Sequence, residues 1–252
     1  MDSQILDFES LIAGMGFLEI QPDQPVPPPG KVVDGQLQGD LSKILVGDMA
    51  MERANLILPQ GLEYAAGSLM QLADMPRMCS LAIGVLLFEA VRRLPPEQVY
   101  LNIGVWHGFT LLAGMLARPD GPCIGVDDFS EWGRPRMAFV ERFARFKCEQ
   151  HRFFDMDYVK YMRQVHKQPI GVYCFDGPHR ELDQSRGLEL AHPYIAAGGL
   201  IFIDDSNEMR VKAPTLAFVQ NHPEYRVIAN FGTVSNTHPT WWNGLMILKK
   251  DP

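Results

Sequence analysis

The sequence predicts an α/β fold: a doubly wound, mostly parallel seven-stranded sheet with an antiparallel hairpin at one edge and a helical cap at the N-terminus. Short apolar runs alternate with helical segments five times between residues 99 and 221. This alternation is typical of a parallel sheet that helices cover on both faces. Two further apolar runs, at residues 225–231 and 245–248, have only a loop between them, so they are expected to pair as an antiparallel hairpin.

The N-terminal part predicts helices that precede this sheet. Apolar residues recur near helical spacing in residues 1–20, and prolines between residues 22 and 30 exclude a helix there. Residues 61–93 are again helical in pattern, with a break at Met75-Pro76, and Pro95-Pro96 ends the pattern. Residues 1–75 are therefore expected as a cap or extension, and residues 76–252 as a single structural unit. The first helix caps this unit or serves a homodimer.

The composition disfavours several classes of protein. The 252 residues suffice for one large or two small domains with a buried core. A net charge of −7 and the lack of a basic run disfavour a nucleic-acid binder. The longest apolar run, Leu81–Phe88, is too short to cross a bilayer, and the acidic start lacks the basic segment of a secretory signal. The four cysteines form no C-x-x-C pair, so free thiols in a reducing, cytoplasmic setting are expected.

The first β-α-β unit, residues 99–128, indicates a nucleotide site. An apolar run ends at Gly104, the turn reads G-V-W-H-G up to Gly108, and a second apolar run ends at Asp127. Glycines let the backbone approach a ligand, and a carboxylate there accepts hydrogen bonds from ribose hydroxyls. Enzymes that bind dinucleotides prefer G-x-G-x-x-G, and the third glycine is missing here. A nicotinamide-dependent oxidoreductase is therefore disfavoured, but it stays an alternative.

The remaining elements follow in order. Helices are expected over residues 135–149, 158–166, 181–195 and 209–221, and Pro214 predicts a kink or a late start of the last of these. Strands are expected over residues 151–154, 170–175 and 200–203.

Acidic residues follow four successive strands at the sheet edge where ligands of open α/β sheets bind. They are Asp127, Asp157, Asp176 and the pair Asp204-Asp205. A ring of carboxylates is repulsive unless a sulfonium group, an amine or a divalent metal lies among them. Asp176, Asp204 and Asp205 end two strands that should be neighbours, which suits Mg²⁺ or another hard cation. The alternative is that these residues cap a helix and form an Asp-Gly turn.

Two motifs carry a resemblance to a known family. F-D-G-P-H at residues 175–179 and H-P-Y-I-A-A-G-G-L-I-F-I-D-D at residues 192–205 resemble the D-G-x-H and GG-hydrophobic-DD pattern of small-molecule O-methyltransferases. These include the macrocin-type sugar enzymes, which are related to the metal-dependent catechol and caffeoyl-CoA enzymes among the class I S-adenosylmethionine (SAM) methyltransferases. The resemblance covers roughly residues 80–250. It implies that residues 76–252 form a SAM-binding methyltransferase domain.

The resemblance also implies roles for individual residues. Asp127 would hold the ribose, Asp157 would lie near the adenine amine, and Thr110 would help to bind the methionine carboxylate. The full expected sets are Asn102, Gly104, Gly108, Thr110, Asp127 and Asp157 for SAM, and Asp176, Asp204 and Asp205 for the metal. The chain departs from the family at Asn102, where an acidic residue is usual, and at Pro178, which is often Asp.

Further side chains are candidates for binding and catalysis. His179 lies three residues after Asp176 and could take a proton from a substrate hydroxyl, or it could only orient a loop. His238, Trp241 and Trp242 in the hairpin loop could form an acceptor-binding wall or pack beneath the cap. His107, in the glycine turn, is expected to pack on the cofactor, and Tyr64 and Trp132 are weaker candidates for lining the site.

Together these observations predict a SAM-dependent O-methyltransferase that acts on a hydroxyl of a small molecule with help from a divalent metal, most simply Mg²⁺. Its partners would be a small-molecule acceptor and neither nucleic acid nor membrane. A non-catalytic relative that binds a metabolite stays open because of Asn102 and Pro178.

Overall fold

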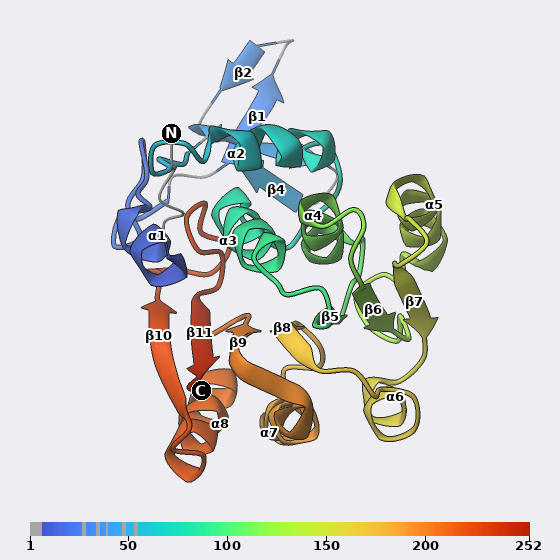
Figure 1. The fold of residues 1–252 in the computed structure, drawn as a ribbon. Coiled ribbons are helices and arrows are strands. Elements are labelled where there is room, and N and C mark those ends of the chain that lie inside the picture. Colours follow the sequence, from blue (N-terminus) through green and yellow to red (C-terminus); the bar gives the residue numbers. More distant parts are fainter. Residues whose placement is uncertain (1–6, 27–28, 34–35, 39, 47–48, 53–54) are drawn as a thin grey trace.

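The structure is a computed structural model, which describes residues 7–26, 29–33, 36–38, 40–46, 49–52 and 55–252. Its main sheet has seven strands in the order β10-β11-β9-β8-β5-β6-β7 (Figure 1). β11 pairs antiparallel with both β9 and β10, and the remaining pairs are parallel. The predicted doubly wound sheet and its edge hairpin are confirmed. The strands are β5 Val99–Ile103, β6 Cys123–Asp127, β7 Arg152–Asp155, β8 Ile170–Phe175, β9 Ile195–Ile203, β10 Tyr225–Phe231 and β11 Leu245–Lys250.

Helices cover the sheet on both faces, with one set above it and one below it in the view of Figure 1. The upper set is α3 Leu81–Arg92, α4 Phe109–Ala117 and α5 Arg136–Phe146. The lower set is α6 Tyr158–Gln164, α7 Glu181–Ala191 and α8 Met209–Asn221. Each set buries its own apolar cluster against the sheet. Because β5 and β8 are buried on both faces, they read as continuous apolar runs rather than alternating ones.

The N-terminal part differs from the expected helical cap. It contains α1 Phe8–Gly14, α2 Glu63–Leu69 and a short 3₁₀ helix, Met70–Leu72. Between α1 and α2 a second sheet has the order β2-β1-β3-β4. Its strands are β1 Pro29–Val33, β2 Gln36–Gln38, β3 Asp40–Val46 and β4 Met49–Glu52. A cap built of helices alone is therefore wrong.

The missed hairpin has a sequence signal. Val33 pairs with Gln36 across the first hairpin of the small sheet, and Asp34 and Gly35, which lie outside the described residues, separate the two in the chain. An Asp-Gly pair between two short runs is a strong hairpin signal. The helical patterns on either side outweighed it. Residues 1–6 of the predicted first helix also lie outside the described residues.

The N-terminal helices share a core with the upper helix layer. Leu11 of α1 and Leu69 of α2 are fully buried in the same apolar cluster as α3 and α4. Arg226 on β10 also forms an ion pair with Glu9 of α1. The expected boundary between residues 75 and 76 stays a prediction.

β9 is longer than expected, whereas α8 keeps the expected bounds of residues 209–221. β9 begins at Ile195 rather than residue 200, because α7 ends at Ala191 and a 3₁₀ turn, His192–Tyr194, leads directly into the strand. α8 begins at Met209 and runs past Pro214, so a late start is wrong, and the alternative of a kink stays a prediction. Pro214 costs the helix one backbone hydrogen bond. Within the described residues, no helix is long and apolar enough to cross a membrane.

The strand register brings the carboxyl ends of β5, β6, β8 and β9 to one edge. Ile103 lies opposite Val126 on one side and opposite Phe175 on the other. The pairing of β5 with β8 continues beyond the end of β8, because the Asp176 amide donates to the Ile103 carbonyl at 2.9 Å. The residues that follow these four strands therefore meet at one place.

Candidate functional site

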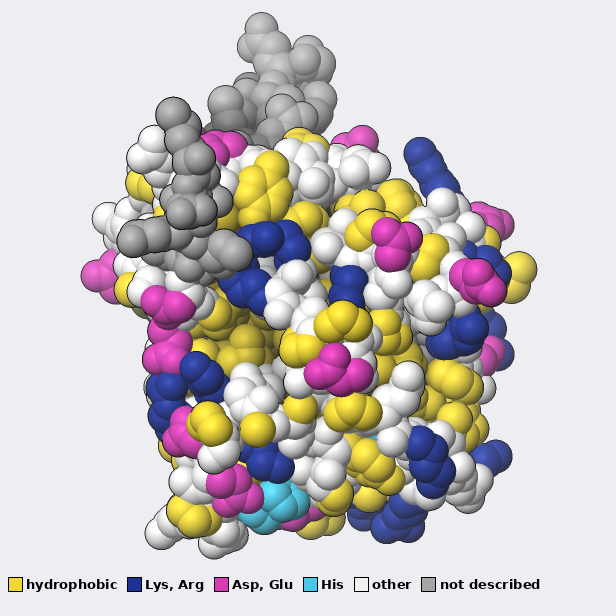
Figure 2. Space-filling view, viewed as in Figure 1, with side chains coloured by type: hydrophobic (Ala, Val, Ile, Leu, Met, Phe, Trp, Pro, Cys, Tyr) yellow, Lys and Arg dark blue, Asp and Glu magenta, His cyan; other side chains and the backbone are white. Residues whose placement is uncertain are grey.

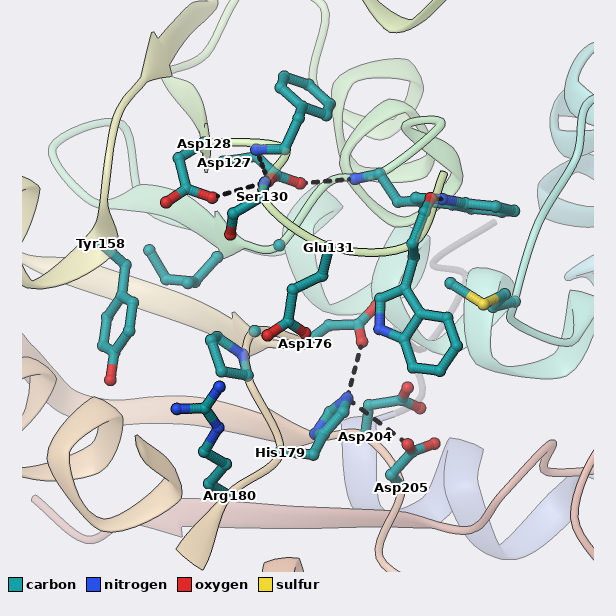
Figure 3. Close-up of a pocket in the computed structure, with 18 of the residues that line it drawn as sticks. Asp127, Asp128, Ser130, Glu131, Tyr158, Asp176, His179, Arg180, Asp204 and Asp205 are labelled. Atoms are coloured by element: carbon teal, nitrogen blue, oxygen red, sulfur yellow. Dashed lines mark hydrogen bonds and ion pairs between the residues drawn. The ribbon is translucent and has the colours of Figure 1, made fainter. Parts of the chain in front are cut away.

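A cavity of about 450 Å³ opens at this edge of the sheet (Figure 3). Its wall is formed by the ends of the central strands, by residues 128–132 and by residues 242–243 from the hairpin loop. The size lies within the range of pockets that hold small ligands. The predicted site residues on its wall are Gly104, Asp127, Trp132, Asp157, Asp176, His179, Asp204, Asp205 and Trp242.

The turn after β5 requires glycine at its first position. Gly104 has a φ of +77°, in the left-handed region that favours glycine. A Cβ at this position would lie 1.8 Å from the carbonyl oxygen of Asp176. The backbones that leave β5 and β8 therefore touch, and this contact fixes the cavity floor.

Asp127 holds the glycine turn. One of its carboxylate oxygens accepts the amides of Val105 at 2.8 Å and Trp106 at 2.9 Å, and the other accepts the amide of Phe129 at 2.7 Å. Three amide donors to one carboxylate lock the end of β6 onto the end of β5. The carboxylate still borders the cavity, and Asp128 beside it lines the same wall.

Three carboxylates converge on His179, as Figure 3 shows. We call Asp176, Asp204 and Asp205 the carboxylate cluster. The Nε2 atom of His179 lies 3.5 Å from an oxygen of Asp176 and 3.5 Å from an oxygen of Asp205. One donor atom each from Asp176, His179 and Asp204 lie within 4.8 Å of one another. The predicted meeting of these carboxylates at one mouth is therefore present in the structure.

The electrostatics of the cluster are unfavourable without a positive partner. Burial, together with the charge of Asp205, raises the pKa of Asp176 well above its ordinary value. Burial, followed by the charges of Asp176 and Asp205, does the same for Asp204. The Nδ1 atom of His179 is buried and has no hydrogen-bond partner among the described residues. A cation at this place would offset the repulsion.

The backbone at Asp205 is unusual for a residue with a side chain. Its φ is +56°, and its carboxylate accepts a hydrogen bond from the amide of Asn243 at 2.7 Å. The hairpin loop therefore braces the carboxylate cluster from the side of β11. A non-glycine residue in the left-handed region stores strain of about 1–3 kcal/mol, which is commonly found at functional sites.

Three of the residues expected at SAM lie behind the cavity wall rather than on it. Asn102 is fully buried, and its side-chain oxygen accepts from the hydroxyl of Thr110 at 2.7 Å. Its amide donates to the carbonyls of Ile103 and Gly104, at 3.2 and 3.0 Å. Gly108, with a φ of +104°, begins α4. These residues support the turn. The side-chain amide of Asn102 can donate to the two carbonyls, whereas an ionised acidic side chain has no hydrogen to donate.

Of the three residues expected to bind the acceptor, only one lies on the cavity wall. His238 is fully buried, and its ring nitrogens contact the hydroxyl of Thr240 at 2.7 Å and the carbonyl of Gln24 at 3.0 Å. Trp241 stacks on Phe231 with ring centroids 4.1 Å apart. Neither of the two lines the cavity. Trp242 does, although it also belongs to the buried core, and its φ is +56°.

Of the remaining candidates, two line the cavity and two do not. Asp157 lines the cavity, and it caps α6 by accepting the amide of Lys160 at 2.8 Å. Trp132 lies on the wall and is 69% exposed. Tyr64 instead donates to Glu89, and His107 contacts Arg142 away from the cavity. Burial, followed by the charge of Arg142, lowers the pKa of His107 to about 4.

Sequence reasoning missed several residues of the wall. Asp128 adjoins the predicted Asp127, and Arg180 adjoins His179, so both could have been found as neighbours of the motifs. Asn243 follows the tryptophan pair but gave no signal of its own. Further lining residues are Met78, Glu131, Tyr158, Glu208, Arg210 and Thr237.

The strand order, the glycine turn after β5 and the acidic strand ends define the fold of a class I SAM-dependent methyltransferase. Residues 101–206 match the sequence model of a family described as a methyltransferase domain. This stretch runs from β5 to just beyond β9 and includes the carboxylate cluster. The resemblance to the class I methyltransferases is therefore confirmed. A comparison with curated proteins gave no match.

Solved structures share the fold at low sequence identity. A putative O-methyltransferase from Klebsiella pneumoniae is 13% identical, with a TM-score of 0.58 over 77% of this chain and 91% of that chain. The O-methyltransferase TomG of tomaymycin synthesis from Streptomyces achromogenes, in complex with SAM, is 17% identical, with a TM-score of 0.52 over 77% and 91%. An O-methyltransferase from Bacillus cereus, in complex with SAH, is 14% identical, with a TM-score of 0.55 over 75% and 91%.

Proposed function

We propose that this protein is a SAM-dependent O-methyltransferase that acts on a hydroxyl of a small molecule and holds a divalent cation beside the cofactor. The convergence of Asp176, Asp204 and Asp205 with His179, next to the Gly104 turn, carries the proposal. A methyl donor and a deprotonated hydroxyl must meet within one cavity, and this edge of the sheet supplies both kinds of site.

The cavity fits SAM in size and in its polar groups. A volume of about 450 Å³ is enough for a nucleoside with a short side chain. The Gly104 turn leaves the backbone open on the cavity side. Asp127 and Asp128 at the end of β6 would offer carboxylate oxygens to ribose hydroxyls, and Asp157, which lines the same cavity, would accept from an adenine amine. When bound, SAM supplies an activated methyl group.

The carboxylate cluster fits a hard divalent cation. Oxygen donors from Asp176 and Asp204 lie within reach of a single ion, and Asp205 is a third donor at the same mouth. Burial and the neighbouring carboxylates raise the pKa values of Asp176 and Asp204, and this supports a site at which a bound cation would stabilise the ionised forms. When bound, the cation would bind acceptor oxygens and lower the pKa of the reacting hydroxyl.

His179 is the candidate general base. Its Nε2 atom faces the cavity mouth, where it would take the proton from the acceptor hydroxyl. Asp176 and Asp205, each 3.5 Å from that atom, would stabilise the imidazolium that results. Trp132 and Trp242 would exclude water from the acceptor. Most of the rate acceleration would come from alignment, which is worth about 7–11 kcal/mol in well-oriented reactions.

A protonated His179 could balance the carboxylates without a metal, and this variant of the mechanism makes a distinct prediction. Methyl transfer would then continue after divalent ions are removed. It would fall only when His179 is replaced by a residue that cannot accept a proton. With the cation, chelation abolishes transfer and added Mg²⁺ restores it.

Calorimetry and a transfer assay test the proposal together. Metal-stripped protein is titrated with SAM and then with Mg²⁺, and methyl transfer from labelled SAM is measured on a panel of catechols, diols and sugars. Asp204→Asn keeps the size of the side chain and should bind SAM while losing Mg²⁺ affinity and transfer. Glu149→Gln, an exposed carboxylate elsewhere, is the matched control. If SAM gives no heat with the wild-type chain, methyl transfer is excluded.

A further inference from the structure

A second group of metal-ligating side chains lies at the opposite end of the sheet. His192 precedes β9, His222 follows α8, and Glu224 precedes β10. We call these three residues the amino-end cluster. β9 runs from this end to the cavity, and its two ends lie opposite Ile170 and Phe175 of β8, a span of about 17–20 Å at about 3.3 Å per residue. The two groups of ligands are therefore independent.

The donor atoms of the amino-end cluster converge. The Nδ1 atoms of His192 and His222 each lie 3.8 Å from the same oxygen of Glu224. One donor atom from each of the three side chains lies within 4.8 Å of the others. Neighbouring ligands of a tetrahedral zinc ion with bonds of about 2.1 Å are about 3.4 Å apart. Closing the site requires each histidine nitrogen to approach Glu224 by about 0.4 Å and the donor pair that is farthest apart to approach by at most about 1.4 Å.

A fourth side chain already orients one of the histidines. The Nε2 atom of His222 lies 3.2 Å from an oxygen of Glu189, which leaves its Nδ1 atom for the side of Glu224. A carboxylate on the far nitrogen of a ligating histidine is the arrangement that fixes its tautomer and raises its basicity in metal sites.

The cluster is accessible to an ion from solvent. The side chains of His192, His222 and Glu224 are 27%, 20% and 38% exposed. Figure 2 shows histidine surface beside acidic side chains near the lower ends of α7 and α8. The neighbouring cation, Lys250, donates to the carbonyl of Ile195 and lies over the ring of Tyr225.

We propose that His192, His222 and Glu224 bind a divalent transition-metal ion of the zinc class, with water in the fourth position. Two imidazoles favour such an ion over Mg²⁺, which prefers oxygen ligands. The hydroxyl of Tyr225 lies 3.1 Å from the Nδ1 atom of His192, which is the atom that would bind the ion, so metal binding would displace this hydrogen bond. The ion joins the end of α7 to the end of α8 and the start of β10.

Zinc titration of metal-stripped protein in excess Mg²⁺ tests the site, because Mg²⁺ competes for the oxygen-rich cavity. One equivalent of Zn²⁺ should bind to the wild type and to the double variant Asp176→Asn with Asp204→Asn. His222→Ala and Glu224→Gln should weaken binding by more than about 100-fold, and Glu189→Gln by about 10–100-fold. Glu149→Gln is the matched control and should bind as the wild type does.

Two further measurements keep the test decisive. Co²⁺ in place of Zn²⁺ should give visible absorption bands of a low-coordinate site in the wild type and not in Glu224→Gln. Circular dichroism without metal checks that each variant is folded, and Glu224→Gln changes a part-exposed side chain if His222→Ala fails this check. Zinc binding that is absent from the wild type, or lost only in the cavity variant, would overturn the proposal and leave the cluster as aromatic packing with Phe218 and Tyr225.

Discussion

Gly104→Ala is the substitution whose consequences the structure defines most closely. The new Cβ would meet the Asp176 carbonyl oxygen at 1.8 Å, where ordinary contact needs at least 3.4 Å. The two backbones must separate by more than 1 Å, or the turn must change its φ of +77°. The left-handed conformation costs alanine about 1–2 kcal/mol, and overpacking costs about 1–3 kcal/mol more. We expect a loss of about 2–5 kcal/mol in the free energy of unfolding.

The matched control is Gly198→Ala. Gly198 has almost the same φ, +75°, but a Cβ there would meet nothing within 4 Å. It should cost only the conformational part, about 1–2 kcal/mol. Urea unfolding followed by circular dichroism measures both variants, and the difference between them reports the clash with Asp176.

The same substitution should impair function through Asp176. A displacement of about 1 Å at a catalytic group can cost about 100-fold in rate, so methyl transfer should fall at least that far in Gly104→Ala and remain near wild type in Gly198→Ala. Equal losses of stability in the two variants, or full activity in Gly104→Ala, would refute the close contact between the ends of β5 and β8.

Three further predictions follow from other parts of the structure. Asp204→Asn should raise the melting temperature of metal-free protein near pH 7, because burial and neighbouring carboxylates raise the pKa of Asp204; the gain should vanish below its ordinary value of 3.8, where the carboxyl is protonated anyway. Hydrogen bonds from Arg226 and Lys249 lower the pKa of Glu9 from 4.5 to about 2, so its stabilisation, about 1 kcal/mol after solvent screening, is present above pH 4.5 and lost as the pH falls toward 2; acid titration of Glu9→Gln should lack this part. Trp241→Ala should cost about 3–5 kcal/mol in urea unfolding yet leave SAM affinity unchanged, since Trp241 packs behind the cavity.

The main sheet could be predicted from the sequence because its central strands are buried on both faces. Runs such as Ile170–Phe175 can only satisfy their apolar content in the middle of a parallel sheet, and acidic residues at their ends mark the ligand side. The small N-terminal sheet was missed because its strands are short and its strongest signal is a single Asp-Gly pair.

Site residues were predictable when they follow a strand directly, and unpredictable when a loop decides their direction. Asp176 and Asp204 could be placed from the order of the strands alone. Trp241 and Trp242 are neighbours in sequence and both are buried in the core, but only Trp242 also borders the cavity. Asn102 was expected among the SAM-binding residues, and its side-chain amide donates to two backbone carbonyls, which periodicity and spacing do not reveal.

The central claim is that the carboxylate cluster holds a divalent cation in the same cavity as SAM. A crystal grown with SAM and Mn²⁺ tests it through the anomalous scattering of manganese. The account predicts one peak about 2.1 Å from oxygens of Asp176 and Asp204, with SAM beside Gly104. SAM in this cavity with no peak at the cluster, and His179 paired with the carboxylates instead, would contradict it.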